Sequence, residues 1–413
     1  MRSVVITGAG VVSSLGDTPA GLHAALCEGR DGVQPVELFD TALLGCPLAG
    51  EVKGFDARRY LGRRNLRPLD RTSRLVGSAA QLALDDSGCT VEMRAEHEVG
   101  LVLGTMFCSV HTISEFDRRA LEAGPAYASP MDFSNTVINA AAGQAAILHN
   151  LRGVNTTVST GVASGLQAIA YAAELIRYGR ARALLAGGAE ELCFESFYGF
   201  DRAGLLCRSN GHEGHYPIPF DARRNGLTLG EGAALLMLED AESARERGAR
   251  VLAEVSGTGC GYDCSRGRDE GQSVKAIARS MRLALFDAGM LTYQVECLSA
   301  SANGSPGGDR HEARAVAEVF CSLTQRMPVT AIKAMLGETL GASGALQAVS
   351  VLETMRGGVL PGIPRLEEVE EDFTLALAGA ASQAVDVSTS LLNSVGFDGH
   401  CCSLILTRRE VFD

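Results

Sequence analysis

Short apolar runs alternate with longer segments of helical pattern along the whole chain. Residues 155–159 predict a strand, and the Ala-rich segment that ends near residue 179 predicts a helix with apolar side chains on almost every face. A further apolar run, ALLAGG, comes next. We expect such a helix to be buried in the middle of a large domain, because no face of it suits contact with water. The pattern is typical of an α/β protein.

The rest of the chain continues this alternation. Residues 70–87 carry the apolar stripe of an amphipathic helix, and residues 99–106 read as a buried strand. The polar residues 195–219 predict a long surface loop. Further helices are expected at 273–289, 310–320 and 342–356, and further strands at 296–302, 329–332, 384–393 and 402–408.

The strand at 155–159 meets its helix at a sharp turn formed by Thr160 and Gly161. A strand, a tight turn and a buried helix together make a nucleophile elbow, which aims one side chain at a pocket. The residue at the elbow is Val162. Because valine has no lone pair, it cannot act as a nucleophile. The sequence therefore predicts the geometry of an active site without its central group.

A glycine-rich segment near the N-terminus raises the question of a nucleotide cofactor. Residues 3–16 read SVVITGAGVVSSLG, with Gly8 and Gly10 where a dinucleotide-binding fingerprint has them. The third glycine of the fingerprint is replaced by Ser13, and no acidic residue closes a second strand about twenty residues further on. We expect a tight strand-to-helix turn and no cofactor.

Charge and composition exclude several classes of function. The net charge is −12 with no basic block to offset it, which argues against nucleic-acid binding. No apolar run reaches the roughly 18 residues of a membrane span, and the first residues predict a strand rather than a signal peptide. The 12 cysteines form no framework, and His212 and His215 lack nearby ligands. We expect a cytoplasmic protein with reduced thiols and no metal site.

An internal repeat organises the chain. Residues 163–169 read ASGLQAI, and residues 342–349 read ASGALQAV. Each segment opens a buried helix after a strand and a glycine-containing turn, and each helix ends near a glycine. The echo predicts a duplicated, five-layered α/β/α/β/α fold, with one half at 1–250 and the other at 251–413.

Several motifs together resemble the β-ketoacyl-acyl-carrier-protein synthases of the condensing-enzyme (thiolase-like) family. The resemblance spans essentially the whole chain. In order, the motifs are VVITGAGVVSSLG, YGRARALLAGGAEE, PFDARRNGLTLGEGAALLMLED, GGDRHEA, IKAMLGETLGASGA and NSVGFDGH. The resemblance implies a thiolase-like fold and acyl-transfer chemistry.

Family members use a cysteine and two histidines, and the resemblance places all three at positions that differ here. The cysteine of a Thr-Ala-Cys turn corresponds to Val162, the histidine of Ala-His-Gly to Asn303, and the second histidine to Glu338. Four supporting positions keep the family's residues: Lys333, Asp309, Glu312 and, in a gating turn that elsewhere reads Gly-Phe-Gly-Gly, Phe397. Asn303 cannot shuttle a proton near neutral pH, and an ionised Glu338 would repel an enolate. Together the changes indicate a pocket that has stopped catalysing.

The family includes such proteins, called chain-length factors or ketosynthase β-subunits. They pair with an active ketosynthase α-subunit and shape the tunnel for the growing chain at the subunit interface. The resemblance thus implies a heterodimer that also works with an acyl carrier protein. Candidate tunnel or interface residues are Phe107, Thr112, Phe116 and Phe133, for which ordinary core packing is the other explanation. Members that make aromatic polyketides have glutamine at the elbow, so Val162 favours a polyene or aryl-polyene product.

Two alternatives remain open from the sequence. One is a stand-alone acyltransferase or decarboxylase with rebuilt chemistry, in which Glu338 acts as a base or Cys401 as a displaced nucleophile. The other is a homodimeric scaffold that binds carrier protein. Carrier proteins are acidic, as this chain is, so docking is expected mainly on the partner subunit. The arginines that would test this by charge reversal are Arg202, Arg208, Arg223 and Arg224.

Overall fold

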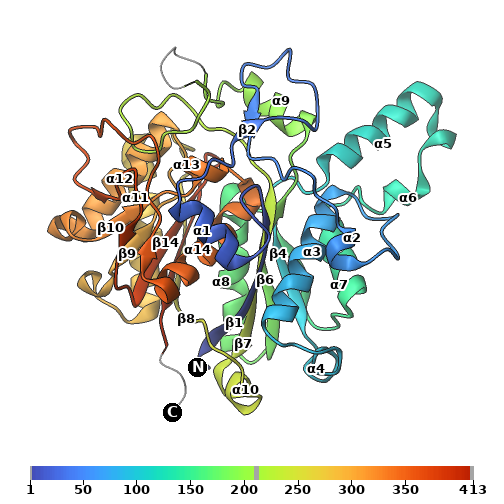
Figure 1. Cartoon of the computed structure of the whole chain (residues 1–413), viewed down its shortest axis with the longest axis horizontal. Coiled ribbons are helices and arrows are strands. Elements are labelled where there is room, and N and C mark those ends of the chain that lie inside the picture. Colours follow the sequence, from blue (N-terminus) through green and yellow to red (C-terminus); the bar gives the residue numbers. More distant parts are fainter. Residues whose placement is uncertain (1, 209–213, 410–413) are drawn as a thin grey trace.

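The computed structural model describes residues 2–208 and 214–409, which form two halves with the same strand connectivity (Figure 1). The first half has the strand order β5-β4-β6-β7-β1, and the second has β10-β9-β14-β15-β8, with the short β12 beyond β10. In each half the first two strands of that order pair in parallel, as do the second and third. The strand bounds are β1 Val4–Ser13, β4 Gly100–Gly104, β5 Asn155–Val158, β6 Ala183–Glu190, β7 Gly232–Asp240, β8 Ala253–Tyr262, β9 Cys297–Ser299, β10 Pro328–Thr330, β12 Ala376–Leu377, β14 Thr389–Val395 and β15 His400–Thr407.

Two helices fill the layer between the halves. Twelve of the fifteen residues of α14 (Ser343–Gly357) are buried, and α8 (Ser164–Arg177) packs against it. Each helix follows a strand of its own half and begins with a short 3-10 turn. A Cβ on Gly165 would overlap the carbonyl oxygen of Gly341, so glycine is needed where the two helix starts meet.

Outer helices complete the five layers. Helix α3 (Arg71–Asp86) packs on β1 in the first half, and α11 (Glu270–Ala288) packs on β8 and against α12 (Pro306–Phe320) in the second. The side chain of Asp70 caps α3 by accepting a hydrogen bond from the Ser73 amide at 2.8 Å. Strands β1 and β8 pair through only two pairs of residues, and this short pairing connects the sheets of the two halves. The fold is the duplicated, thiolase-like five-layered arrangement that the sequence predicts.

The expected turn at Gly8 and Gly10 is wrong, because β1 continues through both glycines, with one irregularity in its pairing with β7 between Ile6 and Gly8. A Cβ on Gly8 would lie 2.5 Å from the backbone nitrogen of Ser87, and a Cβ on Gly10 would overlap the Ala79 carbonyl oxygen. The two glycines therefore let α3 approach the strand closely. Close packing and a dinucleotide-binding fingerprint both require glycine, so the two look alike in sequence.

The loop expected at 195–219 is also wrong in part. Its beginning is helix α9 (Phe194–Arg202), which buries Phe197 and Phe200. His215 places Nδ1 3.2 Å from the Cys207 carbonyl oxygen, whereas His212 lies outside the described residues. The two buried aromatics, spaced three residues apart, are the helical signal that the surrounding polar residues obscured.

Figure 1 shows α5 (Val110–Ala123) and α6 (Pro130–Phe133) as an arm that extends from the body beside α7 (Ala140–His149). Among the described residues no helix is long and apolar enough to cross a lipid bilayer. The remaining elements, apart from short 3-10 turns, are α1 Pro19–Cys27, β2 Gln34–Pro35, β3 Leu48–Ala49, α2 Arg58–Leu61, α4 Val91–Glu96, α10 Ala241–Glu246, α13 Lys333–Leu336, β11 Val359–Leu360 and β13 Gln383–Ala384.

Candidate functional site

The turn after β5 forms the elbow that the sequence predicts. Gly161 has φ +60°, in the left-handed region that favours glycine. The hydroxyl of Ser164 accepts a hydrogen bond from the Thr160 amide at 2.8 Å and donates one to the Gly161 carbonyl oxygen at 2.6 Å. The Ser394 hydroxyl, from the second half, donates to the Val162 carbonyl oxygen at 3.1 Å. The elbow backbone is thus fixed from both halves.

The side chain of Val162 lies in an apolar cluster and is 1% exposed. Phe200 is a buried member of this cluster, and Phe107 packs against it. The ring of Phe200 stands perpendicular to that of Phe107, with centroids 6.4 Å apart, and to that of Phe397, with centroids 5.3 Å apart. The other buried members are Cys46, Ala49, Leu192, Phe197, Leu206, Leu227, Leu229 and Leu340. At the position that the resemblance assigns to a reactive thiol, this chain has a packed hydrophobic wall.

The residues at the two histidine positions are bonded to each other. The Asn303 side-chain nitrogen donates to Glu338 Oε2 at 2.8 Å, and Lys333 Nζ donates to the same oxygen at 2.8 Å. The other oxygen, Oε1, accepts from the Leu340 amide at 3.0 Å and from the Ser343 hydroxyl. Glu338 is fully buried, and its carboxylate is satisfied by four donors. This ion pair with its neighbours, which we call the Glu338 network, leaves Glu338 poorly placed to take a proton from a substrate.

Asn303 and Lys333 have further partners that complete the network. The Asn303 side-chain oxygen accepts from the Ser305 amide at 3.1 Å, and Lys333 Nζ also donates to the Ser301 hydroxyl at 3.1 Å. Because Asn303 uses both ends of its amide within the protein, it is oriented by Glu338 and Ser305 rather than toward an incoming oxyanion.

Two buried carboxylates support this region, as the resemblance implies. Asp309 accepts hydrogen bonds from the backbone amides of Phe220, Asn303 and Gly304 at 2.9–3.1 Å. Glu312 accepts from the Ser301 amide at 2.9 Å, and its pKa is raised to about 7, chiefly because burial disfavours the charged form. Burial raises the pKa of Asp309 as well. Both carboxylates hold backbone amides in place, and both residues also line the cavity beside Asn303.

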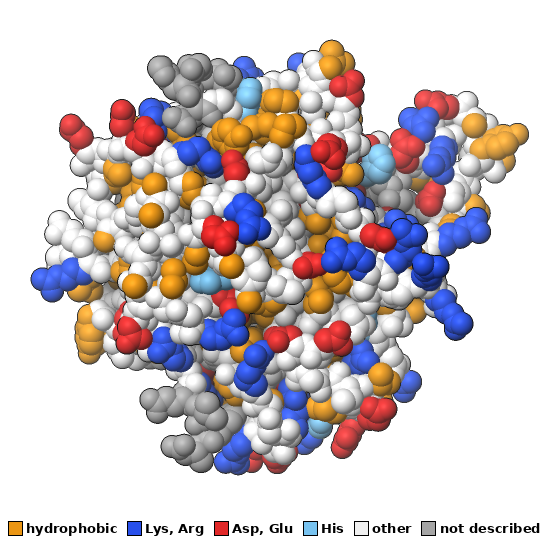
Figure 2. Space-filling view, viewed as in Figure 1, with side chains coloured by type: hydrophobic (Ala, Val, Ile, Leu, Met, Phe, Trp, Pro, Cys, Tyr) orange, Lys and Arg blue, Asp and Glu red, His pale blue; other side chains and the backbone are white. Residues whose placement is uncertain are grey.

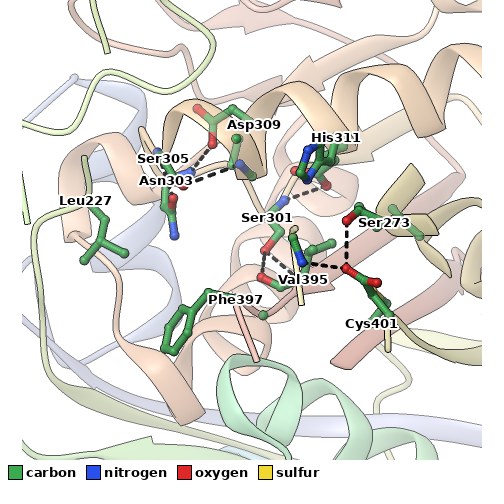
Figure 3. Close-up of a pocket in the computed structure, with 18 of the residues that line it drawn as sticks. Leu227, Ser273, Ser301, Asn303, Ser305, Asp309, His311, Val395, Phe397 and Cys401 are labelled. Carbon is green, nitrogen blue, oxygen red and sulfur yellow. Dashed lines mark hydrogen bonds between the residues drawn. The ribbon is translucent and has the colours of Figure 1, made fainter. Parts of the chain in front are cut away.

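A cavity of about 290 Å³ opens beside Asn303 in the second half (Figure 3). Asn303, Ser301, Phe397, His311 and Cys401 are among its lining residues, which do not include Val162. The figure shows Asn303 and Asp309 at one end and Cys401 near the other, with Phe397 below. Burial, with nearby Asp263, raises the pKa of the Cys401 thiol, so this group stays protonated and is a weak nucleophile.

His311 is a cavity residue that the sequence reasoning missed. It lies on α12, inside the GGDRHEA motif, and burial lowers the pKa of its imidazole. A neutral imidazole can accept a proton, but the cavity shows no activated nucleophile beside it among its described lining residues. The sequence did contain a signal for this residue, because the GGDRHEA motif that was used to identify the family includes a histidine.

Glu190, at the end of β6, was also missed. Its buried carboxylate accepts hydrogen bonds from the backbone amides of Met106, Phe107 and Cys108 at 2.7–2.9 Å and from the Gly341 amide at 3.2 Å. Burial nevertheless raises its pKa to about 7. Glu190 therefore holds the loop that carries Phe107 and ties it to the second half. The motif ending AGGAEE contained it, without any cue to its function.

The four predicted tunnel or interface residues divide between two places. Phe107 lies at the elbow cluster, whereas Phe116 and Phe133 pack against each other on the arm, with ring centroids 5.9 Å apart. Phe133 is 63% exposed, and Thr112 is half-buried on α5. The structure thus brings only Phe107 next to Val162.

Two of the arginines considered for docking are structural. Arg224 is buried and forms ion pairs with Asp309 and Glu370, and Arg223 forms ion pairs with Asp221 and Glu367. Figure 2 shows Lys and Arg side chains gathered over α2 and below the arm, where residues 58–74 include exposed Arg63, Arg64 and Arg67. We call these three residues the arginine patch.

Comparison with known proteins matches the chain over most of its length. Residues 1–244 match the N-terminal domain of β-ketoacyl synthases, and residues 252–367 match their C-terminal domain. A 3-oxoacyl-[acyl-carrier-protein] synthase 2 of Vibrio cholerae is 32% identical over 410 residues, covering 98% of this chain and 99% of that protein. The corresponding enzyme of a Synechocystis species is 31% identical, over 99% of each chain.

Solved structures show the same full-length similarity. The ishigamide ketosynthase/chain length factor superposes with a TM-score of 0.91 at 32% identity, covering 99% of this chain and 100% of that one. A β-ketoacyl synthase from Burkholderia phymatum gives a TM-score of 0.91 at 33% identity, with the same coverage. The fold, the elbow and the full-length similarity lead to one conclusion: the chain belongs to the β-ketoacyl synthase family.

Proposed function

We propose that this chain is a non-catalytic ketosynthase-like subunit, a chain-length factor, that pairs with an active β-ketoacyl synthase and shapes the tunnel for a growing chain. The observation that carries the proposal is the Glu338 network, together with a valine at the elbow. The position of the nucleophile is apolar, and the residues at both histidine positions are consumed by hydrogen bonds within the protein.

The energetics of the network support a settled, non-catalytic state. Moving one partner of a buried, fully bonded ion pair leaves an uncompensated charge, which costs about 3–5 kcal/mol. Catalysis at Glu338 would require it to release Lys333 or Asn303 and to meet substrate in the same buried space. A non-catalytic subunit never has to break the Glu338 network, so it avoids this free-energy cost.

A second subunit has an obvious surface to cover. Strand β5 pairs with β4 on one side and forms the end of the strand order, so its other edge presents backbone groups for pairing. Exposed apolar side chains gather on the adjoining arm and α7, some of them visible in Figure 2. They are Leu121, Tyr127, Met131, Phe133, Val137, Ile138 and Ile147. This face suits a protein partner, and the ketosynthase/chain length factor named above is a relative of that kind.

In this proposal Phe107 limits the chain from the elbow side, and the arm residues Phe116 and Phe133 belong to the subunit interface. Phe107 is fixed by the hydrogen bond from its amide to Glu190 at 2.9 Å and by the ring of Phe200. A rigid aromatic side chain at the closed end of a tunnel would set its length. The valine at the elbow favours a polyene or aryl-polyene product over an aromatic one.

The acyl carrier protein is the second proposed partner. One fold neighbour is named as a type II polyketide carrier protein in complex with its ketosynthase, AntDE:AntF. Docking mainly on the active subunit remains our proposal, and the arginine patch is the place where this chain has the charge to take part. Charge reversal of Arg63, Arg64 and Arg67 in the heterodimer should therefore weaken carrier binding only modestly, and reversal of Arg202 and Arg208 is the matched control.

The decisive experiment is co-expression with an active β-ketoacyl synthase from the same organism, followed by mass determination after size-exclusion chromatography. We expect a one-to-one heterodimer, and we expect the purified chain alone to show no condensing or decarboxylating activity. A stable homodimer that ignores the ketosynthase would contradict the proposal. Activity of the chain alone, lost in H311A or E338Q, would instead support a rebuilt enzyme, whose relatives include 3-oxoacyl-[acyl-carrier-protein] synthases.

A further inference from the structure

Two departures from the family pattern lie in contact at the elbow. Gly161 stands where the resembling turn has alanine, and Asp398 stands in the gating turn where the resembling motif has glycine. A Cβ on Gly161 would overlap Oδ2 and Cγ of Asp398. The carboxylate thus occupies the space that a methyl group at residue 161 would need, so the two changes are sterically complementary.

Asp398 is held in this place from several directions. Its Oδ2 lies 3.0 Å from Nδ1 of His400, whose ring contacts that of Tyr262 with centroids 4.8 Å apart. A Cβ on Gly396 would overlap Asp398 Oδ1, so the carboxylate is also enclosed by its own turn. That turn is closed by hydrogen bonds from the Gly396 amide to the His400 carbonyl oxygen at 2.8 Å and from the Gly399 amide to the Gly396 carbonyl oxygen at 3.0 Å.

The turn between Gly396 and Gly399 carries Phe397, whose ring stands on Phe200 of the elbow cluster. We propose that Asp398 interlocks with Gly161 and pins this turn to the elbow, so that Phe397 is held against Phe200 as a fixed wall. Asp398 is a positioning residue, since it acts through the turn and Phe397. Because an elbow without a nucleophile binds no acyl group, the turn that carries Phe397 does not need to open in such a subunit.

A double-mutant cycle on the purified chain tests the interlock. G161A should lower the melting temperature by several degrees, because the new methyl group meets the carboxylate. D398G alone should change it little, and G161A/D398G should recover most of the loss, leaving only the cost of alanine at positive φ. D386G, at a side chain that is 93% exposed, is the matched control and should rescue nothing. If the effects of G161A and D398G simply add, the interlock is wrong.

Hydrogen exchange of the 394–401 segment provides a second readout, which reports how firmly the turn is held rather than how stable the whole chain is. D398G should speed exchange of the turn amides by about tenfold, whereas D398N, which keeps the shape of the side chain, should retain most of the protection. Unchanged exchange in D398G would overturn the proposal. Both measurements use this chain without a partner, so their outcome is independent of whether the heterodimer forms.

Discussion

The starts of α8 and α14 share one hydrogen-bonding arrangement but carry different side chains, an apolar valine before α8 and a carboxylate before α14. In both, a threonine amide donates to a serine hydroxyl four residues later: Thr160 to Ser164 at 2.8 Å, and Thr339 to Ser343 at 3.1 Å. Both helices then begin with the sequence Ala-Ser-Gly. In the first half the serine hydroxyl donates to main chain, whereas in the second it donates to the Glu338 carboxylate.

The comparison shows that the geometry of a helix start does not determine which side chain it carries. Hydrogen bonds to and from Ser164 shape the first helix start, yet the residue displayed there is an apolar member of a packed cluster. The second start displays a charge that the surrounding structure is built to neutralise. The first half should therefore tolerate substitution at Val162, whereas the second should not tolerate loss of either member of the Lys333–Glu338 pair.

The largest effect is expected from K333M. This substitution leaves Glu338 buried without its cation, which should cost about 3–5 kcal/mol of unfolding free energy. K333M/E338Q removes both charges but keeps a side-chain oxygen for the Leu340 amide and the Ser343 hydroxyl, so it should restore part of that loss. Urea denaturation of the two variants and the parent chain measures the difference. Equal stability of K333M and the parent would show that the network contributes nothing.

An intermediate effect is expected from pH, through buried carboxyls in both halves. Burial raises the pKa of Glu191, just after the first-half strand β6, to about 8, and that of Glu312 in the second half to about 7, both from 4.5. The folded state therefore holds more protons than the unfolded state between pH 4.5 and these values. The stability from these two groups is fully present below pH 4.5 and is lost as pH rises toward 7–8. Each carboxyl contributes a slope of at most about 1.4 kcal/mol per pH unit within that range.

The pH effect also distinguishes the halves. Melting temperatures between pH 5 and 8 should fall less steeply in E191Q than in the parent, and E312Q should flatten the profile to a smaller extent because the pKa of Glu312 is raised less. E371Q, on an exposed side chain, should leave the profile unchanged. A profile that E191Q leaves as steep as before would exclude Glu191 as a source of the dependence.

Much of this comparison could be predicted from sequence, and particular residues show where prediction stopped. The repeat at 163–169 and 342–349 marked both helix starts, because buried helices need apolar residues on every face. The glycines of β1 misled, since close helix packing and a phosphate loop require the same absent side chain. Asn303 and Glu338 were placed by their motifs, but their hydrogen bond joins residues from separate loops, which no local pattern encodes. Asp398 against Gly161 is the same kind of long-range contact.

The smallest effect, and the sharpest contrast with Lys333, is expected at Val162. V162C removes about one methyl group's volume from the cluster and should cost less than about 1.5 kcal/mol. V162A, which leaves a cavity in the same cluster, should cost about 2 kcal/mol and is the matched control. The thiol in V162C should not confer condensing activity, because Asn303 and Glu338 still stand at the two histidine positions and remain bonded to each other. Condensation by V162C alone would mean that the second half had kept its chemistry and that only the first had lost it.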